Sequence, residues 1–248
     1  MTVDRTELKW TYEPSDFFEA PYRHAGCDFD LMVDAGTAMA NLTVPTNPVP
    51  SDLEERVRSF IENVFLLRKF QLHKNYKLEG PTIYQKHSSG RKDVSVRLED
   101  SIVLMDQVDV IVTDAEGNIK RDSKAERIAE STSELDLLAP KLQQSSTLRG
   151  LFVSYSRSVA DPDDEFTHLY EIRDALCHHY GGKCPTLSAL GINASDWGRF
   201  GFLTNEEQLE QSRHRGKHSH GPRPATAEEL DEARKLARQW IIAFARTV

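Results

Sequence analysis

The hydrophobic periodicity of this chain changes close to residue 120, and this change strongly constrains the fold. Before Lys120 apolar residues tend to alternate with polar ones, as in Asp28-Phe-Asp-Leu-Met-Val-Asp34, a pattern typical of strands with one buried face. After Lys120 they recur at the spacing of amphipathic helices. The sequence therefore predicts an α+β fold, with a mixed α/β domain over residues 1–120 and an all-α helical bundle over residues 121–248.

The first part is expected to be rich in short strands. Strand character extends from Leu8 to about Val44, and it returns in three shorter pieces, at residues 82–85, 93–98 and 108–113. The last piece is closed by a turn over residues 114–118. Three aromatic residues in an acidic region are assigned to the core rather than to a base-stacking platform: Trp10, Phe17 and Phe18.

One long helix is expected among these strands. Ser51 and Glu54 have the spacing of a capping box, which predicts a helix that lasts to about Leu72. Apolar residues recur on one face of it, at Leu53, Val57, Phe60, Ile61, Val64 and Leu67. This helix is therefore predicted to pack in the core.

The second part is expected to begin with three helices. Residues 123–144 indicate one or two helices interrupted near Pro140, and residues 147–160 indicate another. Asp161 and Pro162 are typical of the N-cap and first residue of a third helix, which ends at a glycine pair. Its expected buried face contains Phe166, Leu169, Tyr170, Arg173, Leu176, Cys177 and Tyr180.

Two further helices are expected near the end of the sequence. Thr204 and Glu207 predict a short helix that runs directly into Arg213, and Thr226 and Glu229 predict the start of the final one. The final helix has an apolar stripe of Leu230, Ala233, Ala237, Trp240, Ile241 and Phe244.

Composition limits the class of protein. The chain has 248 residues, of which 39% are hydrophobic and 28% charged, which is ordinary for a globular protein. No run approaches the roughly 18 apolar residues of a membrane span, and the N-terminus lacks the apolar segment of a signal peptide. The three cysteines are scattered, which argues against a disulfide framework. A cytoplasmic location with no membrane contact is therefore expected.

A basic segment stands out against the acidic chain, whose formal net charge is -8. Residues 211–221 contain three histidines and three cations, Arg213, Arg215 and Lys217, and no acidic residue. Histidine changes charge near neutral pH whereas arginine stays cationic, so the combination suits proton transfer beside an anion such as phosphate. A solvated basic turn between two helices is an equally open interpretation.

The order of helical motifs in the second half resembles the HEPN superfamily, most closely its Apea-like branch. The resemblance is carried by a helix containing Leu169-Tyr-Glu-Ile-Arg-Asp-Ala-Leu176, a Leu190-Gly-Ile segment, Asp196-Trp197, and Arg213-His-Arg-Gly-Lys-His218 before a terminal amphipathic helix. HEPN domains are helical bundles whose signature is an arginine, usually followed by a polar residue, and a histidine after four to six intervening positions. Active members form a metal-independent RNase site, commonly shared across a dimer. The resemblance covers about the last 110 residues.

The resemblance implies roles for the residues of the basic segment. The catalytic residues would be Arg213 as the stabiliser of phosphoryl charge, His218 as the general acid or base, and His214 as a helper. RNA would be held by Arg215, Lys217, His220 and Arg223, although Arg223 alone fits a structural role better. No cofactor or metal is required by this scheme. A homodimer would bring two imidazoles together.

A second register of the same motif is possible. Arg213 and His218 are separated by four residues, with the polar His214 after the arginine, and this register is preferred. Arg215 and His220 have the same separation, but Gly216 then occupies the polar position. The glycine departs from a continuous helix and weakens the expectation of activity more than that of the fold.

Two other groups of residues resemble metal sites only weakly. Cys177-His-His-Tyr-Gly-Gly-Lys-Cys184 contains four possible ligands, but its cysteine spacing is not that of a zinc site, so a helix end is favoured. Asp106, Asp109 and Asp114 surround a strand and a turn, and a polar hairpin is the preferred interpretation.

Two classes of function remain open from the sequence. The first is an RNase or RNA-binding effector in defence or stress response, with residues 1–120 as a sensor or partner surface of unknown role. The second is a catalytically silent helical module that assembles with other proteins. The overall layout also resembles, more weakly, accessory proteins encoded beside methylamine-utilisation enzymes.

Overall fold

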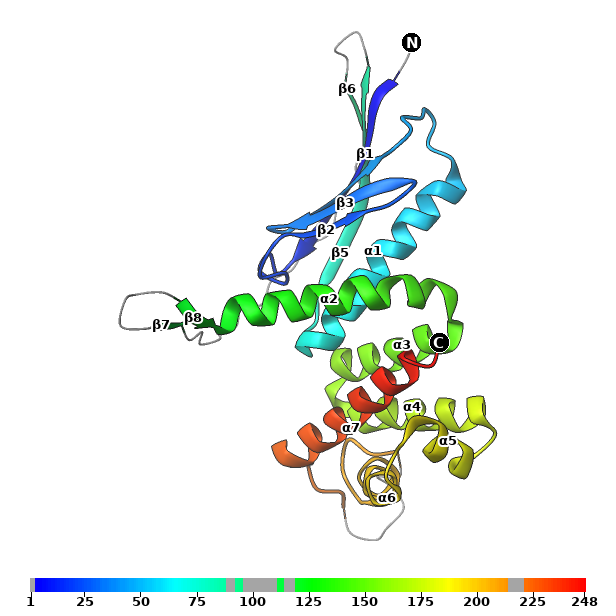
Figure 1. The fold of residues 1–248 in the computed structure, drawn as a ribbon. Coiled ribbons are helices and arrows are strands. Elements are labelled where there is room, and N and C mark those ends of the chain that lie inside the picture. Colours follow the sequence, from blue (N-terminus) through cyan, green and yellow to red (C-terminus); the bar gives the residue numbers. More distant parts are fainter. Residues whose placement is uncertain (1–2, 88–91, 96–110, 114–118, 214–220) are drawn as a thin grey trace. The chain divides into compact units, whose positions relative to one another are not determined.

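The computed structural model describes residues 3–87, 92–95, 111–113, 119–213 and 221–248. The chain divides into two compact units (Figure 1). Unit 1 comprises Met1–Arg68 and Tyr76–Leu137, and unit 2 comprises Lys69–Asn75 and Leu138–Val248. Unit 1 contains an antiparallel sheet and unit 2 is helical, so the predicted α+β class is confirmed.

Unit 1 is organised by a six-stranded sheet in the order β2-β3-β4-β1-β5-β6, with antiparallel neighbours throughout. Its strands are β1 Val3–Glu13, β2 Tyr22–Ala25, β3 Phe29–Asp34, β4 Thr37–Leu42, β5 Lys77–His87 and β6 Lys92–Ser95. A separate two-stranded ribbon pairs β7 Ile111–Thr113 with β8 Ile119–Asp122. The strand character expected from Leu8 to Val44 is therefore confirmed.

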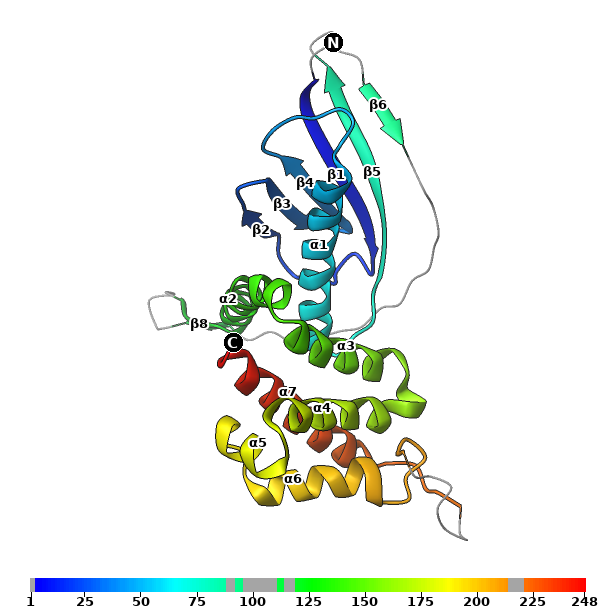
Figure 2. The ribbon, with the colours of Figure 1, turned by 90° about the vertical axis from the view of Figure 1, so that its right-hand side faces the viewer.

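One face of this sheet is buried because its side chains alternate as predicted. Leu8, Trp10 and Tyr12 of β1 are buried, as are Phe17 and Phe18 in the loop that follows, so the assignment of aromatic residues to the core is confirmed. Helix α1, Ser51–Leu72, lies along the sheet (Figures 1 and 2).

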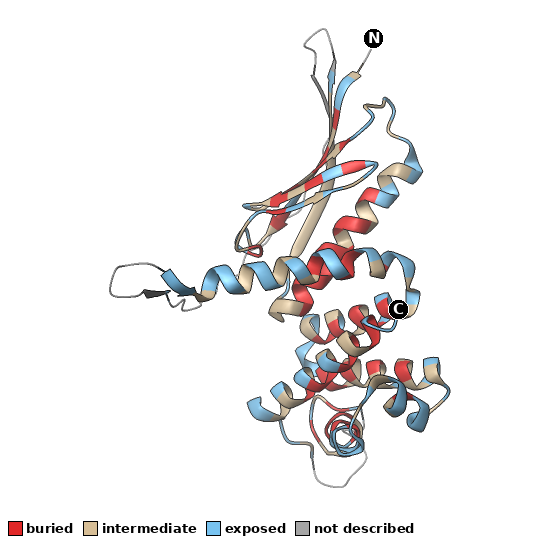
Figure 3. Ribbon diagram, in the orientation of Figure 1, coloured by how far each residue is buried: buried red, intermediate tan, exposed pale blue. Residues whose placement is uncertain are grey.

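Aromatic contacts join α1 to the sheet. The ring of Phe65 lies 5.1 Å from that of Tyr12, and the ring of Phe60 lies 5.7 Å from that of Phe29. Val57, Phe60, Ile61, Val64 and Leu67 are buried as the periodicity predicts, while Leu53 is only half-buried (Figure 3). The packing of this face excludes water from the centre of unit 1.

Helix α2 spans Ser123–Gln144 without a break at Pro140. A proline lacks the N–H that would bond to the carbonyl four residues earlier, but Pro140 lies only four residues before the helix ends, where little of the helix remains to be disturbed. Residues 123–137 of α2 belong to unit 1 and residues 138–144 to unit 2. The sequence places the boundary between about residues 120 and 146, and the structural units divide within this helix.

Unit 2 is a bundle of helices. They are α3 Ser146–Ala160, α4 Glu165–Tyr180, α5 Lys183–Leu190, α6 Ala194–Gly201 and α7 Ala227–Ala245, with a 3-10 turn at Pro162–Asp164 and a π-helical turn at Phe202–Glu206. The indoles of Trp197 in α6 and Trp240 in α7 stack with centroids 4.9 Å apart, and Phe200 lies 4.7 Å from the same Trp240 ring. Five of the six predicted stripe residues of α7 are buried, and Leu230 is half-buried.

Two details of the predicted helices are wrong. Asp161 makes no side-chain cap, because the 3-10 turn separates it from α4, which begins at Glu165. Thr204 does not start a helix, because it lies inside the π-helical turn and its hydroxyl donates to the carbonyl of Phe200 at 2.7 Å. Consequently no helix runs into Arg213. Among the helices that the structure describes, none is long and apolar enough to cross a membrane.

Candidate nucleic-acid interface

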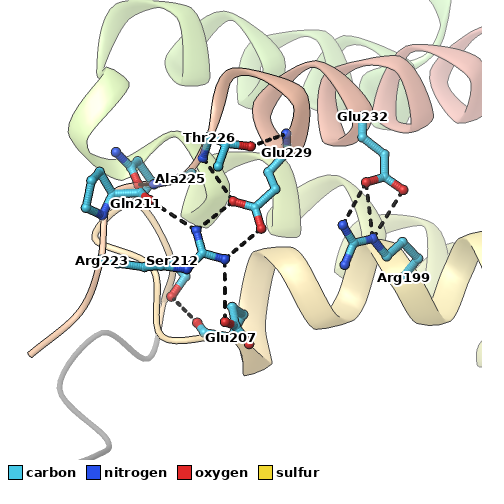
Figure 4. A network of polar contacts seen from close by, with 10 residues as sticks. Arg199, Glu207, Gln211, Ser212, Arg223, Ala225, Thr226, Glu229 and Glu232 are labelled. Carbon is cyan, nitrogen blue, oxygen red and sulfur yellow. Dashed lines mark hydrogen bonds and ion pairs between the residues drawn. The ribbon is translucent and has the colours of Figure 1, made fainter. Parts of the chain in front are cut away.

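The residues on both sides of the basic segment are held together within unit 2 (Figure 4). Leu209 and Arg223 form a parallel bridge, in which the Arg223 N–H donates to Gln208 at 3.1 Å and the Arg223 carbonyl accepts from Glu210 at 2.9 Å. The Ser212 hydroxyl donates to the Glu207 carbonyl at 2.9 Å. The two ends of this part of the chain therefore lie side by side.

Arg223 organises the start of α7. Its guanidinium donates to both carboxylate oxygens of Glu229 at 2.8 and 2.7 Å, and it lies 3.6 Å from Glu207 (Figure 4). Glu229 completes a reciprocal capping box with Thr226, as the sequence predicts. The hydrogen bond from Arg223 lowers the pKa of Glu229 to about 2. These contacts favour the structural role of Arg223.

Arg199 is neutralised in the same manner. Its guanidinium makes three hydrogen bonds of 3.0–3.2 Å to the carboxylate of Glu232 on α7 (Figure 4). Because Arg199 and Arg223 each face a matched acid, neither offers an uncompensated positive charge.

Arg213 has a more open setting. About half of its side chain is exposed, the carboxylate of Asp174 lies 3.6 Å from its guanidinium, and its guanidinium carbon lies 5.5 Å from the centre of the Tyr170 ring. Both partners come from α4. An exposed pair at this distance contributes little binding energy, so an anion in solution can compete with Asp174 for Arg213.

Arg173 approaches the same tyrosine. Its guanidinium carbon lies 5.3 Å from the centre of the Tyr170 ring and 5.0 Å from that of Trp197. Within the described parts of the chain, no carboxylate forms an ion pair with Arg173 and no acceptor takes a hydrogen bond from it. Two guanidinium groups thus meet at Tyr170, and one of them has no compensating acid in the described structure.

Most of the sequence-predicted site lies outside the described residues. This holds for His214, Arg215, Lys217, His218 and His220, and also for Asp106, Asp109 and Asp114. The two registers of the Arg/His motif are therefore not distinguished by the structure. Of the predicted site residues, only Arg213 and Arg223 are described, and they face different acids, Asp174 and Glu229.

A further Arg/His pair lies in α4, and the sequence analysis passed it over. Arg173 is followed by the polar Asp174, and His178 comes after four intervening residues, which is the HEPN spacing described above. Both residues lie in a described helix, and His178 is exposed in its last turn. Because they are five positions apart on an α-helix, Arg173 and His178 are separated by about 7.5 Å along the helix axis. Arg173 and Asp174 belong to the motif Leu169–Leu176 that carries the resemblance, and His178 follows it by two residues, so the spacing could have been found in the sequence.

A buried polar network in unit 2 was also missed. Glu165 is 1% exposed, and its carboxylate accepts two hydrogen bonds from Arg234, at 2.6 and 2.7 Å. The Nδ1 atom of His73 lies 3.1 Å from the Tyr155 hydroxyl, and its Nε2 atom lies 3.7 Å from Glu165. A single polar residue in an apolar pattern gives no sign that it will find a buried partner.

Burial dominates the titration of this network. Burial, followed by the positive charges of Arg234 and Arg238, lowers the pKa of His73 to about 4. Burial likewise raises the pKa of Tyr155 to about 12. At neutral pH both side chains are therefore uncharged, and the approach of His73 to Glu165 is not an ion pair.

Unit 1 contains a shallow hollow between the loop after β1 and helix α2. Charged residues from three elements line it: Glu19 from the loop, Arg68 from α1 and Arg127 from α2. Arg127 donates to Glu19 at 2.6 Å, and the hydrogen bond lowers the pKa of Glu19. Arg68, whose side chain is 6% exposed, donates to the Phe17 carbonyl and to Ser131. These bonds join the three elements around the hollow.

Metal ligands do not gather in the described structure. No group of three or more histidine, cysteine or acidic residues there is arranged to hold a metal ion, and this includes the segment from Cys177 to Cys184. The three cysteines are free thiols, with Cys27 and Cys184 exposed and Cys177 half-buried.

Comparisons with known proteins give no match. No protein-family model, curated protein or solved structure is significantly similar to the chain.

Proposed function

We propose that unit 2 is an RNA-binding module that cleaves RNA without a metal ion. The observation that supports this proposal is the meeting of Arg173 and Arg213 at the ring of Tyr170, with no described acid paired to Arg173. A guanidinium without an acidic partner is suited to a phosphate, and a tyrosine beside it can stack on a base. The bundle fold and the motif spacing agree with the HEPN resemblance.

The proposed reaction is attack of an RNA 2'-hydroxyl on the neighbouring phosphate. A base takes the hydroxyl proton, an arginine stabilises the charge that develops on the phosphoryl oxygens, and an acid protonates the leaving 5'-oxygen. Arg173 and His178 of α4 form one candidate Arg/His pair, and Arg213 with His218, helped by His214, forms the alternative. Arg215, Lys217 and His220 would hold the phosphate backbone.

The proposal includes a homodimer. A site that needs two imidazoles is readily formed when two copies face each other across a symmetric interface. Sedimentation at tens of micromolar is expected to give a dimer. A monomer that cleaves with undiminished rate would remove the shared-site part of the proposal. An RNA substrate also fits the cytoplasmic location expected from the sequence.

The test is cleavage of mixed RNA by the purified full chain in the presence of chelator. A cyclic phosphate at the new end is expected. Arg173→Ala and His178→Ala are each expected to lower the cleavage rate by about two to four powers of ten, the range for losing a charge stabiliser or an acid-base group. Arg199→Ala is the matched control, because this arginine is already paired with Glu232.

The same assay separates the two candidate pairs. If Arg213→Ala and His218→Ala abolish cleavage while the α4 variants are mild, the pair in the basic segment is the catalytic one. A severe His220→Ala together with a mild His218→Ala would instead select the second register. If every variant cleaves as the wild type does, the site lies elsewhere.

A second candidate function is a catalytically silent module that assembles with another protein. It is favoured by Arg223, whose guanidinium is fully engaged with Glu229, as expected for the structural role of this residue rather than for phosphate binding. A wild-type protein that neither binds nor cuts RNA would favour this candidate over the RNase.

A further inference from the structure

Three residues surround the guanidinium of Arg173 in unit 2. Tyr170 comes from the same helix, α4, while Trp197 and Gly201 come from α6. Trp197 and Gly201 are four positions apart on α6, so they lie on the same face of that helix. Trp197 is fully buried and stacks on Trp240, which fixes the ring against which Arg173 lies.

The absence of a side chain at Gly201 makes room for the guanidinium of Arg173. A Cβ atom at this position would lie 3.0 Å from Cζ and 3.4 Å from Nη2 of Arg173, and closer still to Nη1. The approach to Nη1 is too short for non-bonded atoms and that to Cζ is tight, so a larger residue would displace the Arg173 head group.

The backbone at Gly201 does not itself require glycine. Its φ of -61° and ψ of -39° are ordinary right-handed helical angles that every residue adopts. Glycine is also a poor helix former, so its presence here costs α6 some stability. Such a cost suggests that the missing side chain serves another purpose. Close approach of Arg173 is a purpose that the geometry supplies.

We propose that Gly201 and Trp197 position the Arg173 guanidinium for an RNA phosphate, and this inference rests on the function proposed above. The ring faces of Tyr170 and Trp197 and the Cα of Gly201 hold the head group without neutralising its charge. A head group held in advance loses less conformational freedom when it binds phosphate, and it donates in a fixed direction. Gly201 is thus a positioning residue that does not itself contact RNA.

Gly198 provides a matched control on the same helix. It lies three residues before Gly201, and a Cβ atom there would meet nothing within 4 Å. Gly198→Ala and Gly201→Ala both replace a helical glycine by the best helix former, but only the second forces Arg173 to move.

The experiment is a double-mutant cycle on binding of labelled single-stranded RNA at several salt concentrations. Gly201→Ala and Arg173→Ala are each expected to reduce the slope of log K against log salt by about 1, the change for one lost phosphate contact. Gly201→Ala in the Arg173→Ala background should have no further effect, and Gly198→Ala should bind as the wild type does. Equal losses from Gly201→Ala in both backgrounds would overturn the inference.

A readout without RNA separates this inference from the proposed function. The indole N–H resonance of Trp197 is expected to shift similarly in Gly201→Ala and Arg173→Ala, and to stay in place in Gly198→Ala. An unchanged resonance in Gly201→Ala would contradict the positioning role even if RNA binds. A wild type that binds no RNA, with the expected resonance shifts, would remove the RNA function and with it the positioning of Arg173 for phosphate.

The double variant keeps the inference testable if Gly201→Ala by itself does not fold. If Gly201→Ala alone does not fold, Arg173→Ala with Gly201→Ala should fold, since removal of the guanidinium vacates the space that the new methyl group needs. Failure of both would show that Gly201 is required for another reason and would overturn the inference.

Discussion

Glu165 shows how much a single charged residue depends on its partner. The side chain is buried in unit 2, and its two oxygens are both bonded to Arg234. A carboxylate removed from water is tolerated only when such bonds replace its hydration. The exposed pair of Arg199 and Glu232 has similar geometry in a different environment, so the two pairs can be compared directly.

We expect Glu165→Gln to destabilise the protein by about 3 kcal/mol, because it leaves the charge of Arg234 without its buried partner. Glu232→Gln should cost less than about 1 kcal/mol, since that pair is exposed to solvent. Urea unfolding followed by circular dichroism measures both free energies. Equal costs for the two variants would show that burial is not what distinguishes the pairs.

His73 is expected to make stability depend on pH. Its pKa of about 4 in the folded chain lies below its ordinary value of 6.5, chiefly because of burial and then because of Arg234 and Arg238, while Asp231 opposes the shift. As pH falls, the unfolded chain therefore takes up the proton first. The free energy of unfolding should be unaffected by His73 above about pH 6.5 and fall between pH 6.5 and 4, by up to about 3 kcal/mol.

His73→Asn is the variant that tests this dependence. Residue 73 has a φ of 50°, a left-handed conformation that asparagine accepts, so the substitution removes the titration with little backbone strain. The difference in unfolding free energy between wild type and variant should change across pH 6.5–4. A difference that stays constant with pH would contradict the role of His73.

At the scale of elements, the start of α7 is stabilised by a set of reciprocal bonds. The Thr226 hydroxyl accepts from the Glu229 N–H, the Glu229 carboxylate accepts from the Thr226 N–H, and Arg223 bonds to the same carboxylate. The similar spacing of Thr204 and Glu207 gives no cap, because Thr204 continues the backbone of α6. The pattern predicts a helix start only where the preceding chain is not already helical.

Thr226→Ala is expected to destabilise the protein by about 1 kcal/mol, the usual cost of losing an N-cap side chain. Thr226→Ser should retain most of the stability, since its hydroxyl accepts the same bond. Thermal unfolding of the three proteins gives the comparison. A serine variant as unstable as the alanine variant would assign the effect to the lost methyl group instead.

At the scale of the whole molecule, the helical unit is not a continuous stretch of sequence. Lys69–Asn75 belongs to unit 2, although the residues on both sides of it belong to unit 1. Phe70 from this stretch lies 4.7 Å from the ring of Phe152 and 4.9 Å from that of Tyr155. The core of unit 2 is therefore completed by a distant part of the chain.

A fragment of residues 121–248 is accordingly expected to be helical but less stable. It lacks Phe70, and removal of a buried phenylalanine costs about 3–5 kcal/mol. Dye binding to exposed apolar surface and loss of near-ultraviolet dichroism should report the defect, and Phe70→Ala in the full chain should reproduce part of it. A fragment as stable as unit 2 in the full chain would contradict this account of the core.

The sequence by itself determined the fold class, the alternation of β1 to β4, the apolar faces of α1 and α7 and the cap at Thr226. Each of these depends on residues close together in the chain, where spacing alone sets which side chains share a face. It did not determine the unit boundary inside α2 or the continuity of α2 past Pro140.

Only the tertiary structure decided which arginines are neutralised. Arg199 and Arg223 find acids on α7, Arg234 finds Glu165 in α4, and Arg173 rests on Trp197 and Gly201 without a described acid. Glu229 follows Arg223 by six residues, but the partners of Arg199, Arg234 and Arg173 are distant in sequence, and no local pattern relates a cation to a carboxylate from another helix. Charge compensation depends on packing in three dimensions, and for this reason the proposed site includes Arg173 of α4.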